Sequence, residues 1–460
     1  MEFLDENLFL ESDLARELYR TAKDLPIIDY HSHLSPQEIA EDKRFFNLTQ
    51  LWLAGDHYKW RLMRHCGVPE DLVTGKASDR EKFRAFASVL PRCIGNPVSL
   101  WCHMELKKYF GIVRALNAET ADSIYDETEA RMNAEPFTAR RFIAESGVEL
   151  LCTTDDPLDD LHFHKALAKQ ALGFRVVPAF RPDKALNIEA AGFADYVRAL
   201  TNAQAPRLED LEKALESRLD DFCAQGCFAS DHALDNYLFA PCTPDRAERI
   251  FCDRLAGKTP DEAQAEAYRT YLLLRLAKAY HARNMAMQLH FCCRRNNHSE
   301  MFAALGPDTG YDCIRKSERP EKLARFLDAL AGENALPKTI VYSLDPNDDK
   351  TIQTILGCFQ GEIRGKLQHG SAWWFNDTPD GIKAQLKTFS EYAVLGNFIG
   401  MLTDSRSFTS YARHDFFRRI LCNHLAETVN GGVYPPDRNA LEEIVRDVCH
   451  DNAARYFGIA

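Results

Sequence analysis

The sequence predicts an α/β fold, a (β/α)8 TIM-type barrel with a helical insertion after its first strand. Eight apolar, β-branched runs alternate with longer helical patterns, which is typical of parallel β/α units, and eight such units close a barrel. In six of the eight runs the polar residues gather at the carboxyl end, where such barrels build their active sites. A doubly wound open sheet would need a glycine-rich turn after an early strand, and the sequence has none.

The predicted strands are spaced unevenly along the chain. They cover residues 26–34, 148–156, 174–182, 227–233, 286–292, 339–346, 366–375 and 398–405. The gap between the first and second strands is too long for one crossover helix, and it contains several helical patterns separated by proline and glycine. We therefore predict a catalytic barrel formed by residues 1–47 and 148–460, with residues 48–147 as a helical insertion over one rim.

Composition and charge exclude several classes of protein. The net charge is −12 and no block of five or more basic residues occurs, so neither nucleic acid nor an anionic membrane is an expected partner. No apolar run approaches the roughly 18 residues that a membrane span requires, and the acidic start lacks a signal-peptide pattern. Fourteen scattered cysteines without paired C-x-x-C motifs favour reduced thiols in the cytoplasm. The partner we expect is a small molecule, and a homo-oligomer remains open.

His31 and His33 are the most informative residues of the first predicted strand. Their i, i+2 spacing places both imidazoles on one face of a strand, where they would form half of a divalent-metal site. Asp29 falls on the same face and is a candidate acceptor for a hydrogen bond from a metal-bound imidazole. The alternative is a chance pairing among the 15 histidines of the chain.

The last predicted strand supplies Asp404 and Arg406, which would share a face by the period of two. In a closed barrel this strand lies beside the first, so Asp404 would approach His31 and His33. Two nitrogens and one oxygen suit one divalent ion, most naturally zinc, although manganese or another ion would also fit. The alternative for Asp404 is an N-cap for the next helix.

Three further strand ends carry candidate site residues. His290 ends the fifth strand, and Asp231 ends the fourth, where it is preferred to the oppositely directed His232. Arg181, fixed before Pro182 at the end of the third strand, suits bidentate capture of a carboxylate. The alternatives are a core histidine for His290 and a surface ion pair for Arg181.

Residues 373–375, Trp-Trp-Phe, could stack on a sugar ring or fill the core. Neither a G-x-S-x-G elbow nor an H-E-x-x-H helix is present, so nucleophilic serine chemistry has no support.

The D-x-H-x-H strand, together with His290 and Asp404, resembles the amidohydrolase superfamily. Hydrolases of that group usually add a lysine or glutamate on strand four and a histidine on strand six. Here the predicted sixth strand ends Ser-Leu-Asp-Pro-Asn at residues 343–347, and the fourth offers no lysine. This departure points away from binuclear hydrolysis.

A more specific resemblance is to the uronate isomerase (glucuronate isomerase) family. The matching blocks lie in order along almost the whole chain, at residues 55–61, 67–70, 94–97, 103–106, 179–182, 371–377 and 402–411. The resemblance implies interconversion of D-glucuronate with D-fructuronate and of D-galacturonate with D-tagaturonate. One departure is Asn347, where several members have arginine after the strand-six proline.

The resemblance also implies a set of site residues. On the matching positions these are His31, His33, Tyr58, Arg181, Asp231, His290, Trp374, Asp404 and Arg406. Our own assignment makes His31, His33 and Asp404 the metal ligands and Asp404, Tyr58, Arg406 and His290 the catalytic residues. It gives substrate binding to Arg181, Asp231, Trp374 and, in addition, His57. Aldose–ketose isomerisation through a cis-enediol needs a base near carbon and an electrophile near the carbonyl oxygen. We expect Asp404 to be the base and Tyr58 the donor to the enediolate. The rival hypotheses are a mononuclear metal hydrolase or decarboxylase on the same barrel, and a catalytically silent barrel that serves as a binding subunit.

Overall fold

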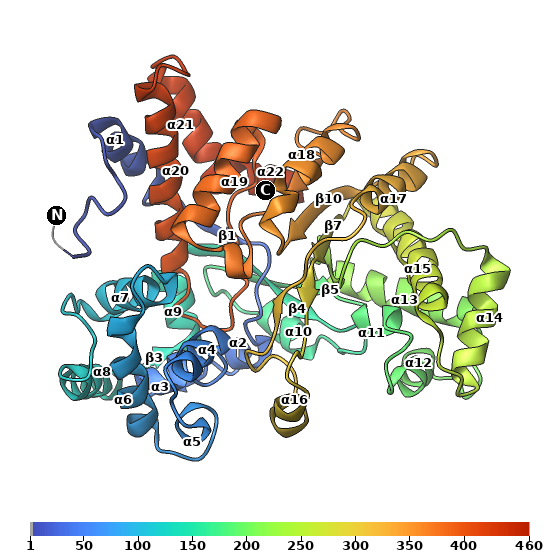
Figure 1. Ribbon diagram of the computed structural model, residues 1–460, viewed down its shortest axis with the longest axis horizontal. Coiled ribbons are helices and arrows are strands. Elements are labelled where there is room, and N and C mark those ends of the chain that lie inside the picture. Colours follow the sequence, from blue (N-terminus) through green and yellow to red (C-terminus); the bar gives the residue numbers. More distant parts are fainter. Residues whose placement is uncertain (1–2, 460) are drawn as a thin grey trace.

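A computed structural model describes residues 3–459 and confirms the α/β class (Figure 1). Seven parallel strands form one curled sheet, a half-barrel, in the order β1-β4-β5-β6-β7-β10-β11. Their bounds are β1 Ile27–Asp29, β4 Val148–Asp155, β5 Arg175–Phe180, β6 Ala229–Ala233, β7 Ala286–Phe291, β10 Lys338–Ser343 and β11 Leu367–His369. Because the spatial order follows the chain order, all seven carboxyl ends meet at one rim.

The predicted eighth strand is wrong. Residues 398–405 form no strand, because the backbone turns into the left-handed region at Gly400 (φ 79°) and Asp404 (φ 43°). The segment still lies beside β1, where the Asp404 amide donates to the His31 carbonyl at 3.1 Å. Beside β1 the segment is therefore held by individual hydrogen bonds rather than by a strand ladder.

The predicted first strand is also too long. β1 ends at Asp29, so His31 and His33 lie in the segment that follows it and not on a pleated strand. The period of two therefore does not explain why these two imidazoles converge, and it does not explain the neighbouring positions of Asp404 and Arg406 either.

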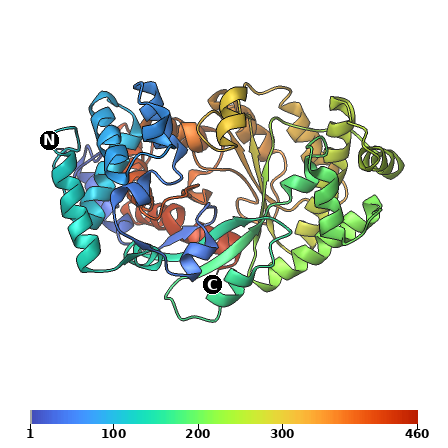
Figure 2. The same cartoon turned by 90° about the horizontal axis from the view of Figure 1, so that it is seen from below.

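Helices surround the sheet on its outer side (Figure 2). Apart from α16, the helices outside residues 48–147 are α1 Asp13–Ala22, α2 Pro36–Ala40, α10 His162–Leu167, α11 Asp183–Leu186, α12 Phe193–Thr201, α13 Leu208–Ala224, α14 Pro244–Leu255, α15 Glu262–Ala282, α17 Glu321–Ala331, α18 Asp349–Gly357, α19 Pro379–Tyr392, α20 Ala412–Asn430, α21 Arg438–Arg446 and α22 Asn452–Phe457. α13 shows why they form: it buries Leu208, Leu211, Leu215, Leu219 and Phe222 at helical spacing. Every residue of β7 and β10 is buried, as expected for strands covered on both faces.

Residues 48–147 contain mainly helices, gathered to one side of the sheet (Figure 1). These are α3 Leu48–Trp52, α4 His57–His65, α5 Glu70–Val73, α6 Asp79–Val89, α7 Pro97–Phe110, α8 Ala121–Ala134 and α9 Ala139–Glu145. The short strands β2 (Arg44–Phe45) and β3 (Phe137–Thr138) pair antiparallel, so the chain leaves and returns at one place. This pairing supports our proposal that residues 48–147 are an insertion.

Several short elements follow the carboxyl ends of β7, β10 and β11. A small hairpin of β8 (Cys293–Arg294) and β9 (Cys313–Ile314) carries α16 (Ser299–Leu305), and the one-turn helices η2 (Pro346–Asp348) and η3 (Trp374–Asn376) follow β10 and β11. Among the described residues, none of the helices combines the length and the apolar character needed to span a bilayer.

Candidate active site

A cavity of about 770 Å³ opens at the carboxyl ends of the strands. Its lining includes every residue predicted for the site except Asp231, namely His31, His33, His57, Tyr58, Arg181, His290, Trp374, Asp404 and Arg406. The carboxyl ends of parallel strands are the usual site-forming edge of this architecture. The cavity is therefore the candidate active site.

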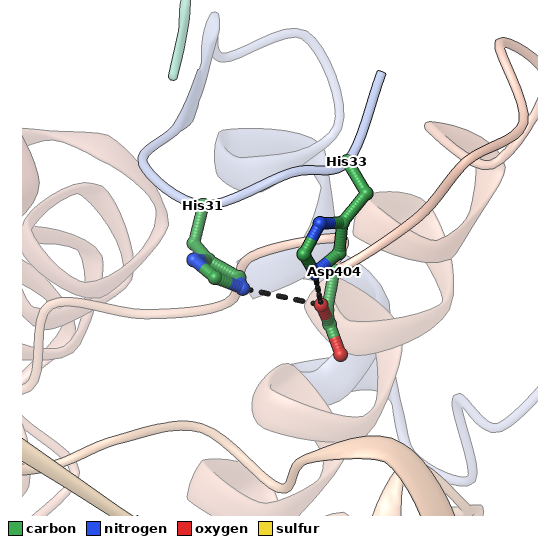
Figure 3. Close-up of side chains that lie close together, drawn as sticks. All are labelled: His31, His33 and Asp404. Atoms are coloured by element: carbon green, nitrogen blue, oxygen red, sulfur yellow. Dashed lines mark hydrogen bonds and ion pairs between the residues drawn. The ribbon is translucent and has the colours of Figure 1, made fainter. Parts of the chain in front are cut away.

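His31, His33 and Asp404 all line the cavity, and their side chains converge (Figure 3). The Nε2 atoms of both histidines lie 3.1 Å from the same carboxylate oxygen, Oδ1 of Asp404. The other oxygen, Oδ2, accepts a hydrogen bond from the indole nitrogen of Trp373 at 2.7 Å. Burial alone would raise the pKa of Asp404, but the hydrogen bonds from His31 and His33 hold it well below its usual value. Asp404 is thus an oriented carboxylate.

Asp29 positions this carboxylate indirectly. Its two oxygens accept from the backbone amide (2.8 Å) and the hydroxyl (2.6 Å) of Thr403, and it is completely buried. Asp29 therefore holds the segment that carries Asp404, and the expectation that it would receive a hydrogen bond from His31 is not met. The N-cap alternative for Asp404 is wrong as well, because the nearest following helix, α20, has Tyr411 as its N-cap.

Asp231 does not line the cavity and has no exposed surface. Its Oδ1 is 2.8 Å from Nδ1 of His290, and its Oδ2 is 3.0 Å from Nε of Arg181. Burial opposes its ionisation, but Arg181, His31 and His290 hold its pKa well below the usual range. With Nδ1 of His290 directed at a carboxylate, the Nε2 lone pair is the one left to act. The ring of His290 also stacks on Tyr342, with centroids 4.2 Å apart, which fixes its plane.

Helix α4 brings His57 and Tyr58 from residues 48–147 to the cavity. Asp56 caps the helix by accepting from the Tyr58 amide at 2.9 Å, so these two side chains start the helix at the rim. His57 stacks on Tyr58 (4.9 Å between centroids) and meets Trp374 edge-on at 5.2 Å. Burial raises the pKa of the Tyr58 hydroxyl well above its usual value, and Asp404 raises it further. Tyr58 is therefore a protonated donor.

Arg406 lies at the exposed rim of the cavity. One of its terminal nitrogens donates to Asp308 at 2.8 Å, and Asp308 belongs to the segment between α16 and β9. Arg295 reaches the same carboxylate at 3.4 Å and lies over the Trp374 ring, 5.8 Å from its centroid. The rim is thus held together by ion pairs that a bound anion could compete for.

The donor set fits a divalent cation. Two overlapping triads bring their ligand atoms within 4.8 Å of one another, His31 with His33 and Asp404, and His31 with Asp231 and His290. Burial lowers the pKa of His33 to about 4, so its imidazole is neutral and able to ligate. Both ring nitrogens of His290 and both oxygens of Asp231 are buried without a well-aligned hydrogen bond among the described residues. Such groups are costly unless something completes their coordination.

Sequence reasoning left two residues that shape the site out of the predicted set. Residues 373–375 were considered for stacking on a sugar, but only Trp374 was assigned to the site, because the sequence does not show in which direction each tryptophan points. Trp373 also lines the cavity and donates to Asp404. Arg413 also lines the cavity and donates to Asp377 at 2.8 Å and to the Thr403 carbonyl. No sequence pattern pointed to Arg413, because α20 meets this segment only in the folded chain.

The carboxyl end of β10 contributes nothing to the lining of the cavity within the described chain. Asp345 caps η2 and accepts from both the backbone and the side-chain amide of Asn347, at 3.1 and 2.7 Å. Asn347 is therefore engaged in a local turn.

The whole chain matches known proteins. A family profile described as glucuronate isomerase matches residues 1–457. The uronate isomerase of Caldicellulosiruptor saccharolyticus is 48% identical, with 99% of each chain covered, and that of Caldanaerobacter subterraneus is 46% identical over 100% of each.

Solved structures agree with these sequences. A uronate isomerase from Thermotoga maritima superposes with a TM-score of 0.94 at 33% identity, covering 99% of this chain and 100% of the other. A putative metal-dependent hydrolase from Lactobacillus casei, at 14% identity and a TM-score of 0.55, shares the fold. The full-length profile match and these relatives show that the chain is an isomerase that belongs to the glucuronate isomerase family.

Proposed function

We propose that the protein interconverts D-glucuronate with D-fructuronate, and D-galacturonate with D-tagaturonate, by proton transfer through a cis-enediol. The observation that carries the proposal is the oriented carboxylate of Asp404, which lies between two imidazoles in a cavity that also holds the protonated Tyr58. A base beside carbon and a donor beside the carbonyl oxygen are what this reaction requires.

Asp404 is the proposed base. It removes the proton from C2 of the open-chain aldehyde, and the C–H electron pair forms the C1–C2 double bond while the carbonyl oxygen becomes an enediolate. Tyr58 donates a hydrogen bond to that oxygen, and Arg406 stabilises its charge. The proton then returns to C1, and a hydroxyl proton moves from O2 to O1, which leaves the ketose.

The low pKa of Asp404 makes it a weak base, so the C2 proton must be made more acidic by the groups around the carbonyl oxygen. Tyr58 serves this purpose as a donor. His290, held between Asp231 and Tyr342, presents Nε2 for the reacting hydroxyl groups. This arrangement places proton transfer on one carboxylate and stabilisation of charge on its neighbours.

Recognition of the substrate carboxylate is assigned to Arg181. Burial opposes its charge, but Asp231 and Asp183 raise its pKa, so the guanidinium stays charged beside the cavity. Trp374 and His57 would pack against the sugar, as aromatic rings do against apolar faces. Local cations of this kind are needed because the chain as a whole carries a net charge of −12.

One divalent ion is proposed on His31, His33 and Asp404, with zinc favoured by nitrogen-rich ligation and manganese as the alternative. When bound, it would orient the uronate carboxylate or a neighbouring hydroxyl group. All fourteen cysteines are free thiols, which supports a reducing compartment, and we propose the cytoplasm.

Proton NMR of D-glucuronate with the purified protein in D₂O tests the proposal. We expect conversion to the ketose with deuterium incorporated at C1, because the transferred proton exchanges with solvent on the carboxylate. Tyr58→Phe should slow the conversion by about 10²-fold, since it removes one donor to the developing oxyanion. If neither glucuronate nor galacturonate changes in the presence of Zn²⁺ or Mn²⁺, the proposed function is wrong and hydrolysis is the next activity to assay.

A further inference from the structure

The loop between α16 and β9, residues 306–312, forms part of the rim of the cavity. Two of its residues, Pro307 and Asp308, line the cavity. The backbone of the loop is left-handed at Gly306 (φ 81°), Asp308 (φ 59°) and Gly310 (φ 97°). The loop thus adds one carboxylate, that of Asp308, to the groups around the site.

Helix α4 anchors this loop. Arg61 donates to the Gly310 carbonyl at 3.4 Å, and Arg64 donates to the carbonyl of the preceding residue. Gly310 packs so closely on the helix that a Cβ at this position would lie 3.2 Å from the His57 carbonyl oxygen. The same helix carries Tyr58, the proposed donor to the enediolate. One element therefore sets the positions of both the loop and Tyr58.

The carboxylate of Asp308 lies between two arginines. Its Oδ2 accepts from Arg406 at 2.8 Å, and its Oδ1 accepts from Arg295 at 3.4 Å. Burial would raise the pKa of Asp308, but Arg406 and Arg295 hold it below its usual value, so the carboxylate is ionised. Arg295 also lies 3.5 Å from Asp312. Two arginines thus meet two carboxylates, and these contacts supply orientation rather than a net charge.

Arg406 depends on Asp308 for its orientation. Its side chain is 38% exposed, and among residues 3–459 its one hydrogen bond is the bond to Asp308. An arginine side chain has many rotamers, so without this bond the guanidinium would not be held in one place. Asp308 engages one terminal nitrogen, which leaves other N–H donors free to face the cavity. An ion pair exposed to this degree contributes little to stability, so aiming the guanidinium is the effect that remains.

We propose, as an extension that rests on the proposed function, that Asp308 is a positioning residue for the isomerisation. It aims the Arg406 guanidinium at the enediolate oxygen to which Tyr58 also donates. A cation that is already oriented needs no reorganisation when charge develops in the transition state. Because α4 anchors the loop, the helix that supplies Tyr58 also sets the direction of Arg406.

A double-mutant cycle in the isomerisation of D-glucuronate tests this role, with Asp308→Asn, Arg406→Gln and the double variant. Asparagine keeps the shape of aspartate and tolerates a left-handed backbone, and the side chain is 36% exposed, so Asp308→Asn should fold. It should lower kcat by about tenfold and leave KM within about twofold, because the aimed charge acts only as the enediolate forms. In the Arg406→Gln background it should change kcat by less than about twofold, since no guanidinium is left to aim.

The control is Glu300→Gln, which removes an exposed carboxylate of α16 outside the cavity lining and should have the kcat and KM of the wild type. A loss of kcat that disappears in the Arg406→Gln background supports the proposal. An unchanged kcat, or an equal loss in both backgrounds, overturns it. A lower KM with unchanged kcat also overturns it, because Asp308 would then compete with the substrate for Arg406. A wild type that converts neither uronate overturns the proposed function itself, which is a different result from equal activity of the wild type and Asp308→Asn.

Discussion

The carboxyl ends of β1 and β10 belong to one sheet and both carry polar residues, yet they are used differently. After β1, His31 and His33 direct their ring nitrogens into the cavity, toward Asp404. After β10, the buried Asp348 accepts from the hydroxyls of Tyr237 (2.8 Å), Ser317 (2.6 Å) and Ser343 (3.0 Å).

The difference teaches that position at the carboxyl end is not enough to make a site. Within the described chain, no residue at the end of β10 from Ser343 to Asp349 lines the cavity, and their polar atoms are satisfied by the fold. The groups after β1 instead retain bonding capacity, such as Nδ1 of His31, which is buried and has no hydrogen-bond partner among residues 3–459. Substitutions after β1 should therefore affect chemistry, and substitutions after β10 should affect stability.

The largest expected effect is that of Asp404→Asn. Losing the proposed base should reduce kcat by about 10³-fold, because general base catalysis typically contributes 10²–10⁴. The thermal midpoint should change little, since asparagine keeps the shape and an oxygen for the Trp373 indole. Steady-state kinetics and a thermal melt of the same preparation measure both quantities. A kcat close to that of the wild type would mean that Asp404 is not the base.

His33→Ala should lower the affinity for zinc by about 100-fold, because it removes one of three proposed ligands. Equilibrium dialysis followed by elemental analysis measures the bound metal. The control is His65→Ala, an exposed histidine at the end of α4, which should bind metal normally. Metal that stays on His33→Ala but leaves Asp231→Asn would assign the ion to the other triad, of His31, Asp231 and His290.

Asp348→Ala should leave kcat unchanged in the folded protein but destabilise it by about 2–4 kcal/mol, because three hydroxyl donors lose a buried acceptor. Chemical denaturation gives the free energy of unfolding. A large loss of kcat with unaltered stability would show that the end of β10 also serves catalysis, contrary to the difference proposed between the two strand ends.

The smallest expected effect is a gain in stability rather than a loss. Burial, reinforced by Asp348 and Asp345, raises the pKa of Asp349 to about 7. As pH rises from 4 to 7, the unfolded chain releases this proton before the folded chain does, so the wild type loses stability over that window. Asp349→Asn removes this loss of stability. The free energy of unfolding of the variant should match that of the wild type near pH 4 and exceed it by about 1–2 kcal/mol at pH 8.

Denaturation at both pH values measures this difference. The matched control is Asp328→Asn, which changes an exposed carboxyl on α17. Its free energy of unfolding should differ from that of the wild type by the same amount at both pH values. A gain from Asp349→Asn that is the same at pH 4 and pH 8 would contradict an origin in ionisation.

Much of the site was predictable because it depends on parallel strands whose ends are visible in the sequence. The apolar runs located seven strands and therefore the rim at which His31, Arg181 and His290 gather. The detailed geometry was not predictable. Asp404 adopts a left-handed conformation instead of a strand, and its direction depends on Asp29, which is 375 residues away in the chain.

The sequence by itself determined the fold class, the side of the sheet that bears the chemistry and, through motifs that lie in order along the chain, the family. These follow from local patterns, since strand periodicity and motif order are properties of neighbouring residues. Only the tertiary structure decided that the eighth segment lies beside β1 without forming a strand, that Asp231 is buried outside the cavity lining, and that Trp373 and Arg413 support Asp404. Those outcomes depend on which distant groups compete for the same hydrogen bonds, and that competition is settled only when the chain is packed.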